Sequence, residues 1–354
     1  MKYTYKDVEL ALEPIEFNKD SGKEILQYAV GGLLYMPASN NKIASKIINR
    51  EYDFVKSMVL DLEDSLGDDM IELGQSNIQK VIDKLDKAVK DDKLSYEDIP
   101  LIFIRIRESG QMEKTIKMLG DNAYYISGFN VPKFDMYNCD DYIKEFTKVK
   151  SKVEHMTDGN STLYIMPIIE NKTAIYRQLR TDNLDIIYNK LKPIQDSVLN
   201  IRVGGADFCS VYGLRRGIHD NIYEIGVVRS VLNDIINVFG RSYVVSGPVW
   251  EYFENKDNPE DVEWLYGLER ELYYDRLAGI LGKTSIHPSQ LPVIQKSLVV
   301  SSSDYNDALK ILGMNPNTTG VVKGATGNRM NEVKTHTNWA KKIISLASIY
   351  GVKA

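Results

Sequence analysis

Cysteine is nearly absent from this sequence of 354 residues, which contains only Cys139 and Cys209. Neither residue belongs to a Cys-x-x-Cys motif or a Cys/His cluster, so a disulfide framework and a structural zinc site are excluded as organising elements. We therefore expect both thiols to be buried and reduced.

Long hydrophobic runs are also lacking. The first 17 residues scatter charges where a signal peptide needs an apolar segment, and no run is long enough to cross a bilayer. Basic residues are not in excess, because 44 Lys and Arg against 49 Asp and Glu give a formal net charge of −5. We expect a soluble, cytoplasmic protein with no nucleic-acid or membrane partner.

What the sequence does contain is a regular alternation of short apolar runs and amphipathic segments. Apolar residues recur at helical spacing over 78–89, 142–153 and 228–239. Eight runs have the character of buried strands, and they cover 33–37, 56–63, 101–107, 123–132, 162–170, 198–205, 242–249 and 284–287. Eight strands alternating with helices predict a (β/α)₈ TIM barrel.

A doubly wound parallel sheet would show the same alternation. We favour the barrel because no Gly-x-Gly-x-x-Gly turn follows the first predicted strand. The predicted organisation is an N-terminal extension over 1–30, a barrel domain over 31–300 and a small helical C-terminal appendage over 301–354.

Carboxylates gather where the second predicted strand ends, in Met58-Val59-Leu60-Asp61-Leu62-Glu63-Asp64-Ser65. Because side chains alternate along a strand, Asp61 and Glu63 are expected on one face. Carboxylates buried there need a metal, a basic group or hydrogen bonds to compensate them. Capping of a following helix by Asp64 or Ser65 accounts for the same acids, and both interpretations stand at this point.

Arginines occupy one face of the third predicted strand, where Arg105 and Arg107 alternate with isoleucines. A guanidinium can bind a carboxylate or phosphate through two hydrogen bonds, so Arg105 is a candidate for holding an acidic substrate. Pairing with Glu63 or Asp64 is the structural alternative, and the two are compatible. Lys133, after the fourth strand, either adds a cation to the same rim or is simply solvated.

Two further acids follow neighbouring strands: Glu170 after the fifth and Asp207 after the sixth. Strand ends meet at one rim of a barrel, and Mg²⁺ prefers a few hard oxygen ligands while keeping waters that a substrate can replace. Either acid alone could cap the next helix, but together they predict a magnesium site. His287, at the eighth strand, is a candidate for substrate contact or for a structural role in its loop.

Taken together and in this order, these segments resemble the citrate lyase beta-subunit-like family of carbon–carbon bond lyases, which includes malyl-CoA lyases. The matching segments are LLYMPASNNKIASK, MVLDLEDS, FIRIR, VPK, LYIMPIIEN, IRVGGADFCSVYGLR and GKTSIHPSQ. The resemblance implies a TIM barrel in which Glu170 and Asp207 hold Mg²⁺, or Mn²⁺ in its place. It also implies that Arg105 binds the carboxylate or carbonyl end of the substrate, with Glu63 and Asp64 supporting that arginine and the metal waters.

The turn that ends at Glu332 is similar to the turn before the last helix of the family. The resemblance implies that Glu332 is the catalytic acid that family members often deliver from a neighbouring subunit. It therefore also implies a homo-oligomer, a trimer or a hexamer.

Three departures from the family pattern set this chain apart. Gly31-Gly32 replaces the usual Arg-Ser pair at the start of the first strand, and Pro37-Ala38 follows that strand instead of Pro-Gly. Arg107 stands where relatives often carry Asn, and Glu332 stands where an Asp is usual. We interpret these changes as the loss of a substrate or CoA contact and a more cationic pocket.

The resemblance and the acidic rim predict a Mg²⁺-dependent lyase or aldolase that cleaves or forms a carbon–carbon bond through a metal-stabilised enolate. The expected substrate is a small hydroxy or keto acid, with phosphorylated and CoA-linked forms left open, and no organic cofactor is expected. The residues expected to contact it are Arg105, Arg107, Lys133, Pro37 and His287. Two alternatives stay open: thioester hydrolysis or condensation at the same site, and a catalytically silent barrel that binds a metabolite within a complex.

Overall fold

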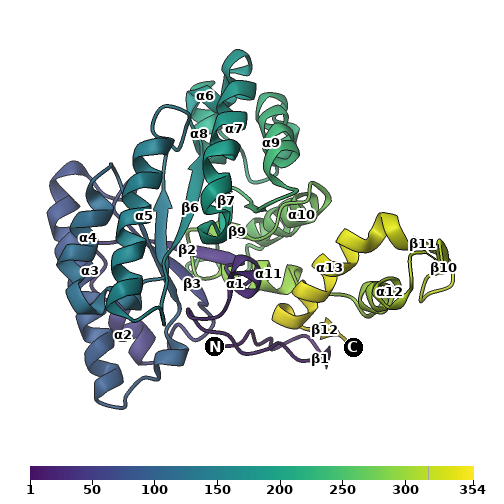
Figure 1. The fold of residues 1–354 in the computed structure, drawn as a ribbon, viewed down its shortest axis with the longest axis horizontal. Coiled ribbons are helices and arrows are strands. Elements are labelled where there is room, and N and C mark those ends of the chain that lie inside the picture. The colour runs from purple at the N-terminus through teal and green to yellow at the C-terminus, as the bar shows by residue number, and fades with distance from the viewer. Residues whose placement is uncertain (318) are drawn as a thin grey trace.

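The computed structural model of the protein describes residues 1–317 and 319–354, and its central element is an eight-stranded parallel sheet curved into a nearly closed barrel (Figure 1). The strand order is β8-β7-β6-β5-β4-β3-β2-β9, and a parallel bridge between Gly247 and Lys283 joins the two outer strands. The strands are β2 (Gly32–Pro37), β3 (Ser57–Asp61), β4 (Leu101–Arg105), β5 (Gly128–Val131), β6 (Tyr164–Ile169), β7 (Asn200–Val203), β8 (Val244–Ser246) and β9 (Lys283–Ser285). The predicted TIM barrel is confirmed.

Helices follow the strands and cover the outside of the barrel (Figure 1). They are α2 (Ile43–Ile48), α3 (Ile71–Lys90), α4 (Gln111–Leu119), α5 (Cys139–Met156), α6 (Lys172–Ile175), α7 (Arg177–Leu191), α8 (Gly205–Val211), α9 (Gly226–Phe239), α10 (Glu263–Leu277) and α11 (Gln290–Ser297). The three predicted apolar stripes lie on α3, α5 and α9 and face the core. Of the helices in the described parts of the chain, none is long and apolar enough to span a membrane.

Most strands are shorter than the apolar runs predicted, and the physical reason is visible for two of them. The fourth predicted strand begins only at Gly128, because residues Gly120–Tyr125 form the short 3₁₀ helix η3. The second ends at Asp61, because the Asp61 carboxylate accepts the backbone N–H groups of Glu63 and Ser65 and so turns the chain out of the sheet. Glu63 and Asp64 therefore stand in a turn at the rim instead of continuing the strand.

The amino-terminal end of the barrel is closed by the two chain ends. The ring of Tyr3 stacks on that of Tyr350, with centroids 4.5 Å apart. Gly31 lies directly beneath them with φ +50°, and a Cβ at this position would overlap the Tyr350 hydroxyl. The glycine that replaces the family's arginine is thus required by packing, at the end of β2 opposite the carboxyl rim.

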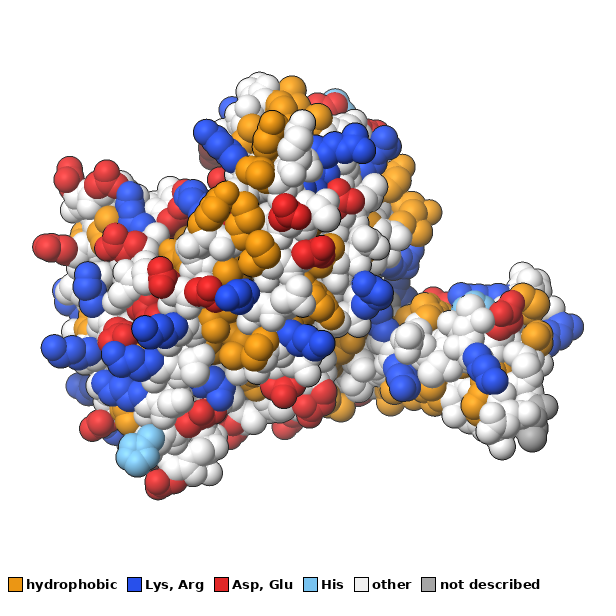
Figure 2. Space-filling model, turned by 45° about the horizontal axis from the view of Figure 1, so that its top comes forward, with side chains coloured by type: hydrophobic (Ala, Val, Ile, Leu, Met, Phe, Trp, Pro, Cys, Tyr) orange, Lys and Arg blue, Asp and Glu red, His pale blue; other side chains and the backbone are white. Residues whose placement is uncertain are grey.

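The elements at the chain ends are β1 (Leu10–Leu12), α1 (Lys23–Ala29), α12 (Ser302–Gly313), β10 (Val321–Lys323), β11 (Met330–Glu332), α13 (Val333–Tyr350) and β12 (Val352–Lys353). β1 pairs antiparallel with β12. The helices α12 and α13 pack together. The last turns of α13 pack against the amino-terminal end of the barrel, whereas its first turns, α12 and the β10–β11 hairpin stand off from it (Figures 1 and 2). The C-terminal segment, predicted as helical, therefore also contains a hairpin.

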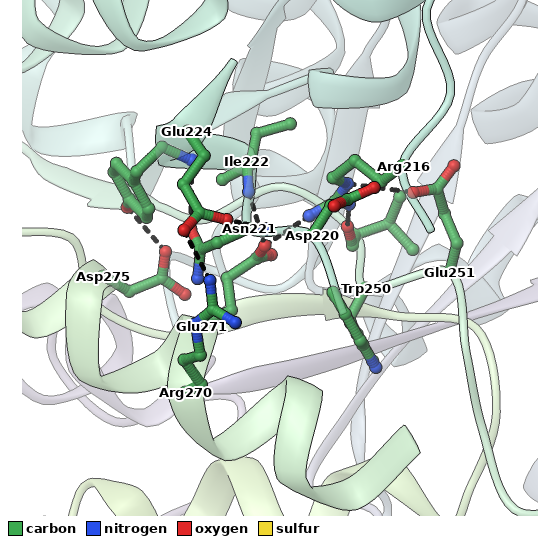
Figure 3. A network of polar contacts seen from close by, with 12 residues as sticks. Arg216, Asp220, Asn221, Ile222, Glu224, Trp250, Glu251, Arg270, Glu271 and Asp275 are labelled. Atoms are coloured by element: carbon green, nitrogen blue, oxygen red, sulfur yellow. Dashed lines mark hydrogen bonds and ion pairs between the residues drawn. The ribbon is translucent and has the colours of Figure 1, made fainter. Parts of the chain in front are cut away.

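A buried network of charges ties α10 to β9 and to the segment between α8 and α9. Lys283, on β9, is fully buried and contacts Glu271 at 2.9 Å and Asp275 at 2.8 Å, both on α10. Figure 3 shows Glu271 directed at Arg216 and at the backbone N–H of Ile222. Although burial alone would lower the pKa of Lys283, the charges of Asp275 and Glu271 raise it above its ordinary value.

Replacing Lys283 with Met should destabilise the protein strongly, because it leaves Asp275 and Glu271 buried with too little positive charge. Breaking a buried ion pair from one side costs about 3–5 kcal/mol. The matched control is Lys148→Met, since Lys148 pairs with Glu113 on the surface and exposed pairs contribute about 0–1 kcal/mol. Denaturant midpoints measure both changes, and equal shifts for the two variants would contradict this account.

Candidate functional site

A cavity of about 440 Å³ opens at the carboxyl ends of the barrel strands. The structure brings five of the predicted site residues together in its lining: Pro37, Asp64, Arg105, Glu170 and Asp207. Each belongs to the end of a different βα unit or to the turn that follows it, which is where barrel enzymes carry their functional groups.

Arg105, at the end of β4, is held by a carboxylate from the neighbouring strand. Its Nε and Nη2 each donate to Asp61 over 2.6 Å, so the pair is bidentate. Its Nη1 contacts Glu63 at 2.9 Å and Asp64 at 3.0 Å. Because three carboxylates already surround this guanidinium, most of its donors are committed within the protein.

Lys133, in the turn after β5, connects the carboxylates around Arg105 to Glu170. Its side chain contacts Glu63, and its backbone N–H donates to Glu170 Oε1 over 2.8 Å. Its φ of +49° lies in the left-handed region, which is strained for lysine. The side-chain amides of Asn138 and Asn171 hold its carbonyl. The strained turn thus lets one residue reach two carboxylates.

Glu170 and Asp207 approach each other across Gly204. A Cβ at Gly204 would overlap the Glu170 carboxylate and lie 3.0 Å from Asp207 Oδ2, so only glycine leaves room for both acids. Neither acid forms an ion pair with any described residue. Burial, reinforced by the charge of Asp207, raises the pKa of Glu170 from near 4.5 to about 8. Burial, followed by the charge of Asp64, also raises the pKa of Asp207.

This pair fits a hard divalent cation by its chemistry. Burial raises the pKa of both carboxylates, and no cation lies between them among the described residues. Mg²⁺ would supply that positive charge. Within the described residues, no group of three or more His, Cys, Asp or Glu side chains is arranged to hold a metal. An ion held by Glu170 and Asp207 would therefore take its other ligands from water or from the substrate.

Five predicted residues do not line the cavity. Two of them support residues that do: Glu63 contacts Arg105 at 2.9 Å, and the backbone N–H of Lys133 donates to Glu170. The other three are Arg107, His287 and Glu332. Arg107 pairs with Asp68 in the turn after β3. The ring of His287 stacks on Phe253, with centroids 4.6 Å apart, and its Nδ1 lies 2.8 Å from Ser289 Oγ. Glu332 stands in the hairpin at the far end of the appendage (Figure 1), where it accepts a hydrogen bond from Thr335.

The cavity also contains residues that the sequence analysis did not assign. Asp61 is the main partner of Arg105, and the two residues are paired in the parallel register of β3 and β4. The only sequence signal for Asp61 was its place in the acidic cluster after the second predicted strand. Tyr35 and Thr284 line the cavity from β2 and β9. Nothing in their local sequence marks them as site residues, because an inward-facing tyrosine or threonine is common in barrel strands.

Comparisons with solved structures agree with this architecture. The protein CitE from Mycobacterium tuberculosis, in complex with magnesium, acetoacetate and coenzyme A, is 15% identical, with a TM-score of 0.58 over 91% of this chain and 99% of that chain. A citrate lyase from Burkholderia xenovorans LB400 is 12% identical, with a TM-score of 0.64 over 90% of this chain and 91% of that one. At these identities the likeness shows the shared fold.

The family comparison reaches further. No curated protein matches the sequence. A family model described as "C-C_Bond_Lyase of the TIM-Barrel fold" matches residues 24–352, which is nearly the whole chain. The protein therefore belongs to the carbon–carbon bond lyase family of the TIM-barrel fold.

Proposed function

We propose that the protein is a Mg²⁺-dependent carbon–carbon bond lyase or aldolase that acts on a small keto or hydroxy acid. The observation that carries the proposal is the placement of the Glu170 and Asp207 carboxylates across Gly204 at the carboxyl rim. Family membership supports the reaction class, and the relative CitE was crystallised with magnesium and acetoacetate.

The reaction class sets clear demands on the site. Cleaving a carbon–carbon bond next to a carbonyl leaves an enolate, whose charge must be compensated and whose carbon must be protonated. A divalent cation held by Glu170 and Asp207 supplies Lewis-acid stabilisation of negative charge on a carbonyl oxygen. Arg105, fixed by Asp61, would orient the acidic end of the substrate with the donors that remain to it. Glu63 and Asp64 would keep that guanidinium in place.

The outer rim offers further contacts to the distal part of a substrate. Lys133 is half-exposed and lies beside Glu63, so it would present a cation at the mouth of the cavity. Pro37 lines the cavity wall. Arg107 and His287 stand outside the lining and would contact only a substrate that extends beyond the mouth.

The proton donor is proposed to come from a second copy of the chain. Glu332 lies on a hairpin that projects away from its own barrel (Figure 1). A carboxylate in this position would reach a rim only by docking against another subunit. We therefore propose that Glu332 acts in a homo-oligomer, across the interface.

Mg²⁺ together with pyruvate, oxaloacetate or acetoacetate should raise the melting temperature of the protein. A ligand that binds only the folded state at 100 times its Kd stabilises that state by about 2.7 kcal/mol. The variants Glu170→Gln and Asp207→Asn should lose this shift, whereas the surface variant Glu113→Gln should keep it.

Exchange of the pyruvate methyl protons in D₂O, followed by NMR, reports enolate formation directly. Unchanged exchange in both acid variants would refute the proposed ligands, and release of free CoA from acyl-CoA would indicate thioester hydrolysis instead.

The raised pKa of Glu170 should make the metal-free protein less stable as pH rises. Between pH 4.5 and about 8 this carboxyl is protonated in the folded state but ionised in the unfolded state. The folded state then binds more protons, so its stability falls with pH, by at most about 1.4 kcal/mol per unit. Melting temperatures of the wild type relative to Glu170→Gln should show this decline without Mg²⁺. Saturating Mg²⁺ should abolish it, and a rising curve would contradict the assignment.

Mixing two inactive variants should restore activity if Glu332 acts across an interface. Glu332→Gln supplies an intact barrel site, and Glu170→Gln supplies an intact hairpin. After co-refolding in equal amounts, about a quarter of the interfaces would join the two intact halves. Pyruvate proton exchange should then recover to about a quarter of the wild-type rate. No recovery, with mixed oligomers confirmed by native mass spectrometry, would show that Glu332 does not act in trans.

A further inference from the structure

Arg202 is a buried arginine inside the barrel that the proposed chemistry does not use. It lies on β7 between Ile201 and Val203, whose side chains pack in the core between barrel and helices. The alternation of the strand directs Arg202 to the opposite, inner face. Its side chain is only 1% exposed.

The guanidinium of Arg202 has few partners. Its Nη2 donates to Thr284 Oγ1 over 2.7 Å, and its Cζ lies 6.0 Å from the centre of the Tyr35 ring. Its Nε and Nη1 have no hydrogen-bond partner, and no carboxylate among residues 1–317 and 319–354 pairs with it. An unpaired buried charge is among the most costly features a protein can carry. Burial correspondingly lowers the pKa of Arg202.

This unpaired cation lies directly behind the cavity wall. Both of its contacts, Tyr35 and Thr284, are largely buried and line the cavity, as does Val203, its neighbour on β7. A rotation of the Thr284 or Tyr35 side chain would open the guanidinium of Arg202 to the cavity. Asn130, which donates to the Tyr35 hydroxyl, also has an unpartnered Oδ1. Unsatisfied polar atoms therefore gather at the floor of the site.

The contrast with Arg105 indicates which kind of group is missing. Arg105 also faces the ring of Tyr35, at 5.2 Å, but it is surrounded by three carboxylates. Arg202 pairs with no carboxylate of the described residues, and its Nε and Nη1 donors are free. A carboxylate or phosphate is the group that a guanidinium binds best.

We propose that Arg202 and Thr284 form an anion subsite at the floor of the cavity, which receives a second acidic group of the substrate. The substrate class is then a small dianionic acid, either a dicarboxylate or a phosphorylated acid. One end would lie at Glu170 and Asp207, and the other at Arg202. The position of the first end rests on the proposed function, whereas the anion subsite itself does not need a metal.

Binding measured by calorimetry on the full-length protein tests the subsite. The probes are pyruvate, oxaloacetate, phosphoglycolate and inorganic phosphate, each with EDTA and with Mg²⁺. The wild type should bind one of the dianions about 10- to 100-fold more tightly than pyruvate, and Arg202→Met should lose this preference. The oxaloacetate and phosphoglycolate arms distinguish a carboxylate from a phosphate. Equal affinities for pyruvate and for every dianion in the wild type would overturn the proposal without any variant.

The melting temperature separates a binding role from a structural one. Because the charge of Arg202 is unpaired, Arg202→Met should leave the ligand-free protein as stable as the wild type or more stable. Arg180→Met is the matched control, since Arg180 is also buried but donates to Ala174, Ile175, Ser230 and Asp234. Its melting temperature should fall. A destabilised or unfolded Arg202→Met would overturn the proposal.

These experiments give different results if the anion subsite is wrong and if the proposed lyase function is wrong. If Glu170→Gln keeps the preference for the dianion while pyruvate exchange is absent in all proteins, the subsite stands and the lyase chemistry fails. If Mg²⁺-dependent exchange is present but Arg202→Met binds every acid as the wild type does, only the subsite fails.

Discussion

The bidentate ion pair between Arg105 and Asp61 organises the rim of this barrel. Asp61 receives two donors of Arg105 and the backbone N–H groups of Glu63 and Ser65. One buried carboxylate therefore sets both the direction of the guanidinium and the turn that carries Glu63 and Asp64. Glu63 in turn contacts Lys133, whose backbone N–H binds Glu170. The orientation of the proposed metal ligand thus depends on contacts that begin at Asp61, three strands away.

This network divides the charges of the cavity into two groups. On the side of β3 and β4, acids and bases compensate one another, and that part of the site is complete without a ligand. On the side of β6 and β7, no described side chain forms an ion pair with Glu170, Asp207 or Arg202, and two nitrogens of Arg202 have no hydrogen-bond partner. Glu170 and Asp207 need a positive charge near the mouth of the cavity, and Arg202 needs a negative charge at its floor. A divalent cation bound together with an acidic substrate would meet both needs. The acid pair without a cation and the arginine without an anion both lower the stability of the folded protein. Proteins commonly accept such a loss of stability at functional sites.

The sequence predicted those features that depend on residues close together in the chain, and it did not predict contacts between residues far apart in it. Periodicity is local, so the eight strands and the helices between them could be placed, and alternation correctly directed Arg105 inward. The match of Asp61 with Arg105 depends on the register of two strands 44 residues apart, which single-strand patterns do not contain. The sequence comparison related Gly31 to a lost substrate or CoA contact. The structure adds a packing constraint from Tyr350 at this position, and no local pattern links residues at opposite ends of the chain.

Two buried cations show why burial alone does not reveal a role. Lys283 and Arg202 lie on β9 and β7, both almost without exposure and each the only basic residue in an otherwise uncharged strand. From the sequence alone they are equivalent. Lys283 contacts Glu271 and Asp275 from α10, so its charge is compensated by helices outside the barrel and it fastens the wall of the cavity. Arg202 faces the inside, where no described acid meets it. The side of the sheet to which each points, and hence the presence or absence of an acid, separates a cation that holds the fold from one that awaits a ligand.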